Sequence, residues 1–247
     1  MMTEPKLEPL PDGVVETLRQ VSTSTVATQL YRRGFRQPQL LGVRPLSEAA
    51  DGFAGEAFTM RFIPMREDVD TLDPYRSGNT LQWEAFESVP PGQVLVIDSY
   101  QDAAAASGGD MLVTRAWKRG AAAVVTDGGL RDGHVLAKVP FPTYARTVTI
   151  TTRAAAHHVA DLQVPIGCAG VAVYPGDVLL GDRDGVLVIP RALAAEIAEQ
   201  GLEQEKLEAF VSKKIHAGEP LWGNYPPGEE VKAEFKASLA AAGEDTA

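Results

Sequence analysis

The sequence is short of cysteine and of basic residues. Its 247 residues include one cysteine, Cys168, and 23 Lys and Arg against 33 Asp and Glu. A lone cysteine cannot form a disulfide within the chain, which is typical of the reducing cytoplasm, where we expect this protein. The net charge of −10 argues against a nucleic-acid partner, because phosphate contacts need clustered Lys and Arg. A few arginines focused in a cleft would still bind a small anion.

Long apolar runs are missing as well. No stretch of the sequence approaches the roughly 18 consecutive apolar residues that cross a bilayer. Residues 1–12 are polar and contain three prolines, unlike a signal peptide. We therefore expect neither secretion nor a membrane partner. With 45% hydrophobic and 23% charged residues, the composition is that of a globular chain able to bury a substantial core.

Strand-like and helix-like segments alternate along the chain. The patterns predict a short arm over 1–12, one α/β domain over 13–218, and a loosely ordered tail over 219–247. Two prolines in the segment 140–145 indicate an edge strand. Helices are predicted over 13–19, 23–33, 110–120 and 191–217, and strands over 53–62, 93–98, 121–127, 140–145, 164–173, 178–181 and 185–190.

Two glycine turns contain the residues best suited to chemistry. Ser107-Gly-Gly-Asp-Met-Leu stands at a predicted helix start, where unpaired N–H groups can receive a carboxylate or phosphate. Asp127-Gly-Gly-Leu-Arg-Asp follows a predicted strand. Its arginine can bind a carboxylate through two parallel hydrogen bonds, and its last aspartate can bind a hard divalent cation. On physical grounds alone, a capping aspartate and a solvated Arg-Asp turn remain open alternatives.

The combination of the two turns resembles a known family. Gly109-Asp110-Met111-Leu112 followed by Arg131-Asp132 is similar to the class II pyruvate aldolases, typified by 4-hydroxy-4-methyl-2-oxoglutarate aldolase. The same superfamily includes the regulator of ribonuclease activity A. The likeness runs from about residue 22 to residue 218. It also includes the Pro-Gly-Asp and Gly-Asp-Arg-Asp-Gly-Val-Leu-Val-Ile-Pro segments within 175–190.

The resemblance implies a fold, an activity and an assembly. The fold is a single three-layer β/β/α swivelling-type domain with N- and C-terminal helical extensions, assembled as a homotrimer or homohexamer with sites between subunits. The activity is cleavage of a 4-hydroxy-2-oxo acid to pyruvate and a carbonyl product, with decarboxylation of oxaloacetate as a side reaction. The alternative within the superfamily is a non-catalytic regulator that binds and inhibits an endoribonuclease.

The resemblance also implies roles for individual residues. Asp132 would be the direct ligand of a Mg²⁺ or Mn²⁺ ion, and Asp110 would orient water on that ion. Arg131 would contact the substrate and steady its carboxylate or the developing enolate. A divalent cation stabilises such an enolate as a Lewis acid, and Mg²⁺ needs only one or two protein carboxylates. The residues expected to bind the 2-oxo acid substrate are Gly109, Asp110, Met111, Leu112 and Arg131.

Three further positions bear on the resemblance. The family uses a glutamate from a neighbouring subunit, for which Glu205 and Glu208 are the candidates. Its first helix often has Asp where this chain has Thr28. The segment 66–85 contains polar and aromatic residues, including Trp83, and is interpreted either as a border of the site that reads the distal part of the substrate or as a surface or subunit-contact loop.

Other chemistries fit the sequence less well. A Schiff-base aldolase needs a lysine in an apolar strand or pocket, and the predicted strands contain none. The four histidines of the sequence form no zinc pattern with Cys168. His134 is interpreted as a loop residue and the His157-His158 pair as surface, whereas the cysteine is a candidate for the core. Asp182 and Asp184 are interpreted as turn formers, because the terminal Glu of a calcium loop is missing.

Overall fold

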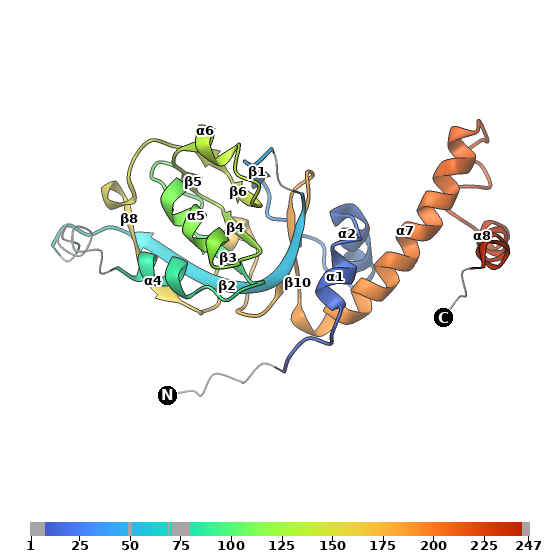
Figure 1. Ribbon diagram of the computed structural model, residues 1–247, viewed down its shortest axis with the longest axis horizontal. Coiled ribbons are helices and arrows are strands. Elements are labelled where there is room, and N and C mark those ends of the chain that lie inside the picture. The colour runs from blue at the N-terminus through green and yellow to red at the C-terminus, as the bar shows by residue number, and fades with distance from the viewer. Residues whose placement is uncertain (1–7, 49–50, 69, 71–79, 244–247) are drawn as a thin grey trace.

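The computed structural model describes residues 8–48, 51–68, 70 and 80–243, and in it a curled sheet lies between two groups of helices (Figure 1). The helices are α1 (Val14–Leu18), α2 (Thr23–Arg32), α4 (Leu81–Ser88), α5 (Asp110–Lys118), α6 (Gly133–Leu136), α7 (Ala194–His216) and α8 (Glu229–Ala242), with 3-10 turns η1 (Arg153–Ala155), η2 (Cys168–Gly170) and η3 (Arg191–Leu193). The strands are β1 (Arg44–Pro45), β2 (Phe53–Pro64), β3 (Val94–Asp98), β4 (Ala123–Thr126), β5 (Gly129–Leu130), β6 (Thr143–Ala145), β7 (Thr147–Val148), β8 (His157–Leu162), β9 (Val178–Gly181) and β10 (Val186–Ile189).

The long strand β2 belongs to both halves of the sheet, whose order is β1-β6-β4-β3-β2-β9-β10. Its first residues, 53–56, pair antiparallel with β9, and residues 57–61 pair parallel with β3. Its last residues, 60–64, pair antiparallel with β8. Strands β3, β4 and β6 are parallel to one another. Their carboxyl ends therefore meet at one edge of the sheet, where loops can converge on a site.

Alternating side chains on the strands separate three apolar layers. In β3, Leu95 and Ile97 pack with α4 and α5. The valines on the opposite face of the strand, Val94 and Val96, face the strands β9 and β10. In β10, Val186 and Val188 face that inter-strand core, whereas Leu187 packs against the terminal helices. A strand with both faces buried reads as a continuous apolar run. The fold is thus a single α/β domain with a β/β/α core, and helices from both chain ends cover its outer sheet face.

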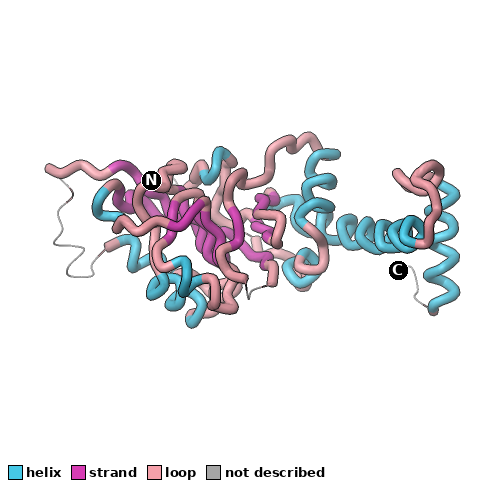
Figure 2. Tube along the Cα trace, turned by 90° about the horizontal axis from the view of Figure 1, so that it is seen from above, coloured by secondary structure: helices cyan, strands magenta, loops and turns pink. Residues whose placement is uncertain are grey.

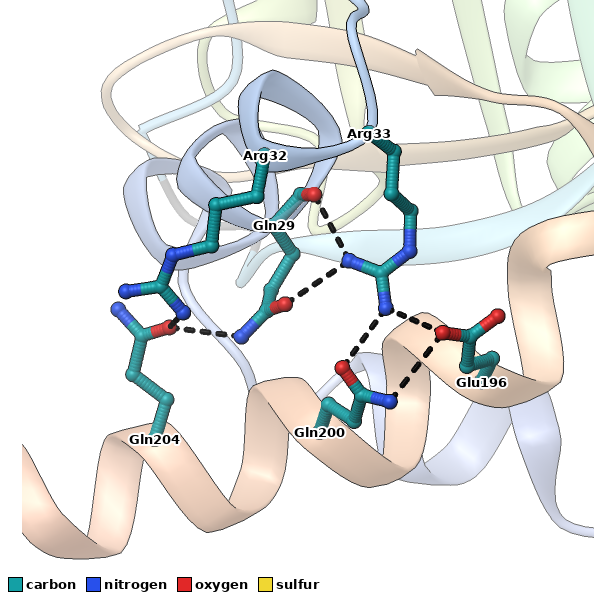
Figure 3. Close-up of polar contacts among 6 residues, drawn as sticks. All are labelled: Gln29, Arg32, Arg33, Glu196, Gln200 and Gln204. Carbon is teal, nitrogen blue, oxygen red and sulfur yellow. Dashed lines mark hydrogen bonds and ion pairs between the residues drawn. The ribbon is translucent and has the colours of Figure 1, made fainter.

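The terminal helices are fastened to one another by side chains. Helix α2 is capped by Ser22, whose hydroxyl accepts a hydrogen bond from Thr25 N. Figure 3 shows the contact between α2 and α7, in which Arg33 donates to Glu196 Oε1 at 2.6 Å and to Gln200 Oε1 at 2.7 Å. Beyond this contact α7 runs away from the sheet, and α8 lies across its far end in both views (Figures 1 and 2).

Most of the predicted elements are present, but three predictions are wrong. The segment 164–173 is not a strand: its polypeptide turns through η2, and only one isolated bridge joins Ile166 to Val173. Strand β6 is not at the edge, because β1 pairs with it on the outside. The tail after residue 218 is not loose throughout. It contains the 14-residue helix α8, in which Val231 is buried and Phe235 packs on Phe210.

Candidate active site

The two glycine turns lie side by side at the carboxyl edge of the parallel strands. Ser107 N donates to Gly129 O at 2.8 Å, and Arg131 N donates to Gly108 O at 2.9 Å. The arrangement follows from the topology, because the first turn comes after β3 and the second after the neighbouring parallel strand β4. Backbone bonds therefore fix the start of α5 against the Arg-Asp pair.

A missing side chain allows the two turns to approach closely. Gly109 precedes α5 in an extended conformation, and a Cβ atom at this position would lie 2.8 Å from Asp132 Oδ2. Real Cβ atoms do not come so close to an oxygen, so any other residue would push the carboxylate away. The same carboxylate oxygen is 3.5 Å from Asp110 N at the helix start. The helix N-terminus and its unpaired N–H groups favour a negative charge at this point.

A cavity of about 320 Å³ opens over this junction. All six site residues predicted from the sequence line it. Six further residues complete its described wall, among them Ala106 just before the first glycine turn and Gly108 within it. The predicted residues are Gly109, Asp110, Met111, Leu112, Arg131 and Asp132, and the others that bear on the site are Gln82, Trp83, Thr152 and Arg153.

The described wall of the cavity contains side chains of both charges. The Arg131 guanidinium, half-buried, makes no hydrogen bond or ion pair with any residue that the structure describes. Asp110 Oδ1 accepts from Met111 N at 2.8 Å, which holds this carboxylate at the helix start. Two guanidinium groups, of Arg131 and Arg153, and two carboxylates thus share the cavity wall. This set suits a ligand that has an anionic end and can share a bound cation.

The wall formed by α4 supports one of the two interpretations of the segment 66–85. Gln82 is 3% exposed, and its Nε2 donates to Ser107 O at 2.7 Å, so α4 is tied directly to the first glycine turn. Trp83 lines the cavity and is 46% exposed. This end of the segment borders the candidate site. Residues 71–79 lie outside the described residues.

Buried polar groups below the cavity fix the loops around it. The Asp127 carboxylate accepts backbone N–H bonds from Ser99 at 2.7 Å and from Ala169 at 2.8 Å. Burial raises the pKa of Asp127, and these N–H bonds oppose that rise. The Ser107 hydroxyl lies 3.1 Å from that of Thr126. These contacts hold the ends of β3 and β4 in fixed positions below the cavity.

The metal stays a prediction, and the residues of the cavity can be compared with the donor set that a divalent cation needs. Among the described residues no group of three His, Cys, Asp or Glu side chains is arranged to hold a metal ion. Mg²⁺ keeps several waters and needs only one or two protein carboxylates. Asp132, pressed against the space left by Gly109, and Asp110 beside it supply such a donor set. The residues present therefore fit a hydrated divalent cation and do not fit a closed zinc site.

Of the remaining sequence interpretations, some are confirmed and one is wrong. Cys168 is completely buried, as predicted, and burial raises its pKa well above the ordinary value. Asp182 Oδ1 accepts from Asp184 N at 2.8 Å, which confirms the turn. His134 is exposed in α6. The surface interpretation of His157 is wrong: this residue is completely buried in β8, where its ring lies 4.4 Å from that of Phe62.

The glutamate candidates point to other partners within this chain. Glu205 Oε1 accepts from Ser22 N at 2.9 Å, and Glu208 Oε1 accepts from Gln204 at 2.7 Å. Neither is among the described residues that line the cavity of its own chain. A role in a neighbouring subunit stays a prediction. At the position where the family often has Asp, the Thr28 hydroxyl donates to Ser24 O at 3.0 Å.

Comparison with known proteins identifies the family of this chain. A sequence profile described as RraA-like, Aldolase/RraA, matches residues 23–188. This chain belongs to the RraA-like family. A Halalkalibacterium halodurans relative, provisionally named 4-hydroxy-4-methyl-2-oxoglutarate aldolase, is 32% identical over 182 residues, which is 70% of this chain and 85% of that protein. Within the described residues no helix is long and apolar enough to cross a membrane.

Two further RraA-like relatives carry different names. A Thermus thermophilus protein named 4-hydroxy-4-methyl-2-oxoglutarate aldolase is 36% identical over 138 residues, covering 56% of this chain and 76% of that protein. The crystal structure of Streptomyces coelicolor RraAS2, described as an unusual member of the RNase ES inhibitor RraA family, superposes with a TM-score of 0.75 at 30% identity. It covers 83% of this chain and 100% of that one. The relatives thus include proteins named as aldolases and a protein named within an inhibitor family.

Proposed function

We propose that the protein is a divalent-metal-dependent aldolase that cleaves a 4-hydroxy-2-oxo acid to pyruvate and a carbonyl product. The observation that carries the proposal is the close approach of Gly109 to Asp132 in one cavity with the Arg131 guanidinium, which has no partner among the described residues. The names of two relatives as aldolases support the same reaction class.

The reaction requires that the C4 hydroxyl lose a proton, that the charge of the enolate be stabilised, and that C3 take up a proton. The bond between C3 and C4 breaks and its electron pair stays on C3 as an enolate, while the C4 hydroxyl loses its proton and becomes the carbonyl. The enolate then takes a proton at C3 to give pyruvate. The negative charge therefore has to be held at the 2-oxo and carboxylate oxygens. Fixed positive groups placed where charge develops provide this stabilisation.

The residues of the cavity are suited to these requirements. Arg131 would bind the substrate carboxylate with paired N–H groups. Asp132 and Asp110 would hold Mg²⁺ or Mn²⁺, which when bound polarises the 2-oxo group as a Lewis acid. The N–H groups at the start of α5 would orient the pyruvyl end, because a helix N-terminus attracts anions. Gly109 would keep room for the Asp132 carboxylate.

Pyruvate release tests the proposal. Purified protein is incubated with Mg²⁺ or Mn²⁺ and a panel of 4-hydroxy-2-oxo acids, and pyruvate is measured with lactate dehydrogenase. We expect metal-dependent release that falls at least 100-fold in Asp132→Asn, which removes the charge and keeps the shape. Glu87→Gln, on the outer face where Glu87 binds Arg115, is the matched control and should retain full activity. Pyruvate release that needs no metal, or an unaffected Asp132→Asn variant, would refute the proposal.

The name of the Streptomyces coelicolor relative supports one alternative, a regulator of an endoribonuclease. Binding to a purified endoribonuclease of the RNase E type, and inhibition of RNA cleavage, are measured with the same variants. Inhibition that is equal in wild type and Asp132→Asn, with no pyruvate released from any acid, would favour the regulator over the aldolase.

A further inference from the structure

Part of the cavity wall is formed by large apolar side chains that reach solvent. Trp83 of α4 lines the cavity and is 46% exposed, and Met111 in the first turn of α5 lines it and is 78% exposed. The half-buried Leu112 also belongs to the wall. Such side chains lose contact with water favourably when something covers them. The cavity therefore offers an apolar surface beside its charged groups.

The position of Trp83 is fixed by its helix. Trp83 N donates to the hydroxyl of Thr80, which caps α4, at 3.3 Å. The neighbouring Gln82 donates to Ser107 O at 2.7 Å, and Phe86 is completely buried in the core that α4 covers. Helix α4 is thus held against the first glycine turn, and it places the indole in the same cavity as the start of α5.

The indole ring of Trp83 has no partner within the described part of the chain. Its N–H donates no hydrogen bond there, and neither a second aromatic ring nor a cation stacks on it. Trp117 differs, because its ring stacks on Phe141 with centroids 6.4 Å apart and Lys118 Nζ lies 3.6 Å from its centroid. A rigid aromatic face that the chain itself leaves open can be covered by an apolar or planar ligand group.

The proposed reaction indicates which part of a substrate meets this surface. All candidate substrates share the pyruvyl end, for which the charged groups at the start of α5 are suited. The part that differs between them is the group on C4, which leaves with the carbonyl product. A cavity of about 320 Å³ lies within the range of small-molecule sites. A group on C4 can therefore lie against Trp83 while the pyruvyl end lies beside Arg131.

We propose that Trp83, together with Met111, binds an aromatic group on C4 of the substrate, so that the carbonyl product is an aromatic aldehyde or ketone. This inference rests on the proposed function and deepens it. The indole supplies a flat and rigid face, and the flexible thioether of the methionine adapts to the edge of a ring. A substrate with only a small group on C4 would leave this surface in water and would bind more weakly.

Ligand binding tests the inference without any need for turnover. The probes are 2-oxo-4-phenylbutanoate and 2-oxobutanoate, which differ only in the phenyl group on C4 and cannot be cleaved because they lack the C4 hydroxyl. Their affinities for the full-length protein in saturating Mg²⁺ are measured by titration calorimetry. We expect wild type to prefer the phenyl compound about tenfold or more, from burial of the two ring faces. In Trp83→Ala this preference should fall to about twofold, with the affinity for 2-oxobutanoate nearly unchanged.

Three further variants separate recognition from structural damage. Trp83→Phe keeps an aromatic ring and should retain part of the preference, with the melting temperature of wild type. Met111→Ser should lower the preference by a smaller factor than Trp83→Ala. Trp222→Ala is the matched control: Trp222 lies between α7 and α8, is 89% exposed and is absent from the described cavity wall, so neither affinity should change.

Tryptophan fluorescence reports the contact itself. Binding of 2-oxo-4-phenylbutanoate should shift the emission of wild type to shorter wavelength, because the ring of Trp83 leaves water. The shift should disappear in Trp83→Phe and persist in Trp222→Phe. A shift that persists in Trp83→Phe would contradict the inference.

The outcomes distinguish this inference from the proposed function. A preference that survives in Trp83→Ala would overturn the inference, as would an equal loss of both ligands or a wild type without a preference. A change in the mass of the assembled protein in Trp83→Ala, with the preference intact, would make the indole a subunit contact instead. Release of pyruvate with either of these results would leave the aldolase standing. A preference that depends on Trp83, with no pyruvate released from any acid, would support the inference as a binding site and refute the aldolase.

Discussion

Two of the described helices begin at an uncapped glycine with extended backbone, and their surroundings differ. Gly109 opens α5 and Gly228 opens α8, each with extended backbone and no side-chain cap. A Cβ at position 109 would lie 2.8 Å from the Asp132 carboxylate, whereas one at position 228 would have no atom within 4 Å. The glycine at the cavity is required by a close approach, and the other is compatible with any small residue. Similar local backbone thus has different importance in the two places.

The same contrast extends to the two regions around these glycines. The cavity is held by backbone hydrogen bonds between loops that follow parallel strands. The C-terminal arm, defined as residues 205–243 and called the arm below, is held together by side chains. The ring centroids of Phe210 and Phe235 are 5.7 Å apart, and Lys214 pairs with Glu234. The exposed pairs of the arm contribute little stability. We therefore expect changes in the cavity to affect activity and changes in the arm to affect local opening.

The largest expected effect is that of Gly109→Ala. The new methyl group displaces Asp132, so kcat/KM for pyruvate release should fall about 100-fold or more, because small misplacements of catalytic groups have effects of this size. The melting temperature should change by only a few degrees. Gly228→Ala is the matched control and should keep full activity. Equal activity in the two variants would contradict the importance of the close approach.

The contact at the base of α7 should give the next largest effect, on stability. Arg33 is mostly buried and donates four hydrogen bonds, to Gln29, Glu196 and Gln200. Arg33→Met should lower the free energy of unfolding by about 2 kcal/mol, because bonds to charged groups contribute about 1.5–3 kcal/mol. Urea denaturation measures the change, with the exposed Arg32→Met as the comparison. Activity per folded molecule should stay within twofold, since the contact is remote from the cavity.

Stability below neutral pH should depend on His157. Burial lowers the pKa of this residue below its ordinary value of 6.5. Between its lowered folded pKa and 6.5 the unfolded chain binds more protons, so stability is present above about pH 6.5 and is lost as the pH falls. The slope is at most about 1.4 kcal/mol per pH unit for one group. His157→Phe keeps the packing on Phe62, and its unfolding free energy should fall less than that of wild type between pH 7 and pH 5.

The smallest effect on the whole molecule should come from Phe235→Ala. Loss of the ring contact with Phe210 should speed amide hydrogen exchange in α8 about tenfold, because such a contact contributes about 0.5–1.5 kcal/mol. Exchange in β3 and β4, activity and the global unfolding free energy should not change. A global loss of stability would show that the arm unfolds together with the sheet, and would remove the contrast between the two regions.

Local signals explain which elements the sequence predicts. The apolar run of β3, the cap at Ser22 and the glycine after α5 each act within a few residues, and the structure has all three. Helix α8 also has such a signal, because Val231, Phe235 and Leu239 recur every four residues. The many small and acidic residues of this segment favoured the prediction of a loosely ordered tail instead. Strand β8 had none, because two histidines and an aspartate interrupt its apolar residues.

The sequence by itself determined the two glycine turns, the residues in them and the family that they resemble. These features are local, since a glycine, an aspartate and an arginine need only their neighbours to be recognised. Only the tertiary structure decided that Gly109 faces Asp132 and that Gln82 and Arg153 complete the cavity wall. Gln82 and Arg153 are 71 positions apart and are joined by a side-chain hydrogen bond. Such contacts depend on the order of the strands and on the packing of α4, which no local pattern encodes.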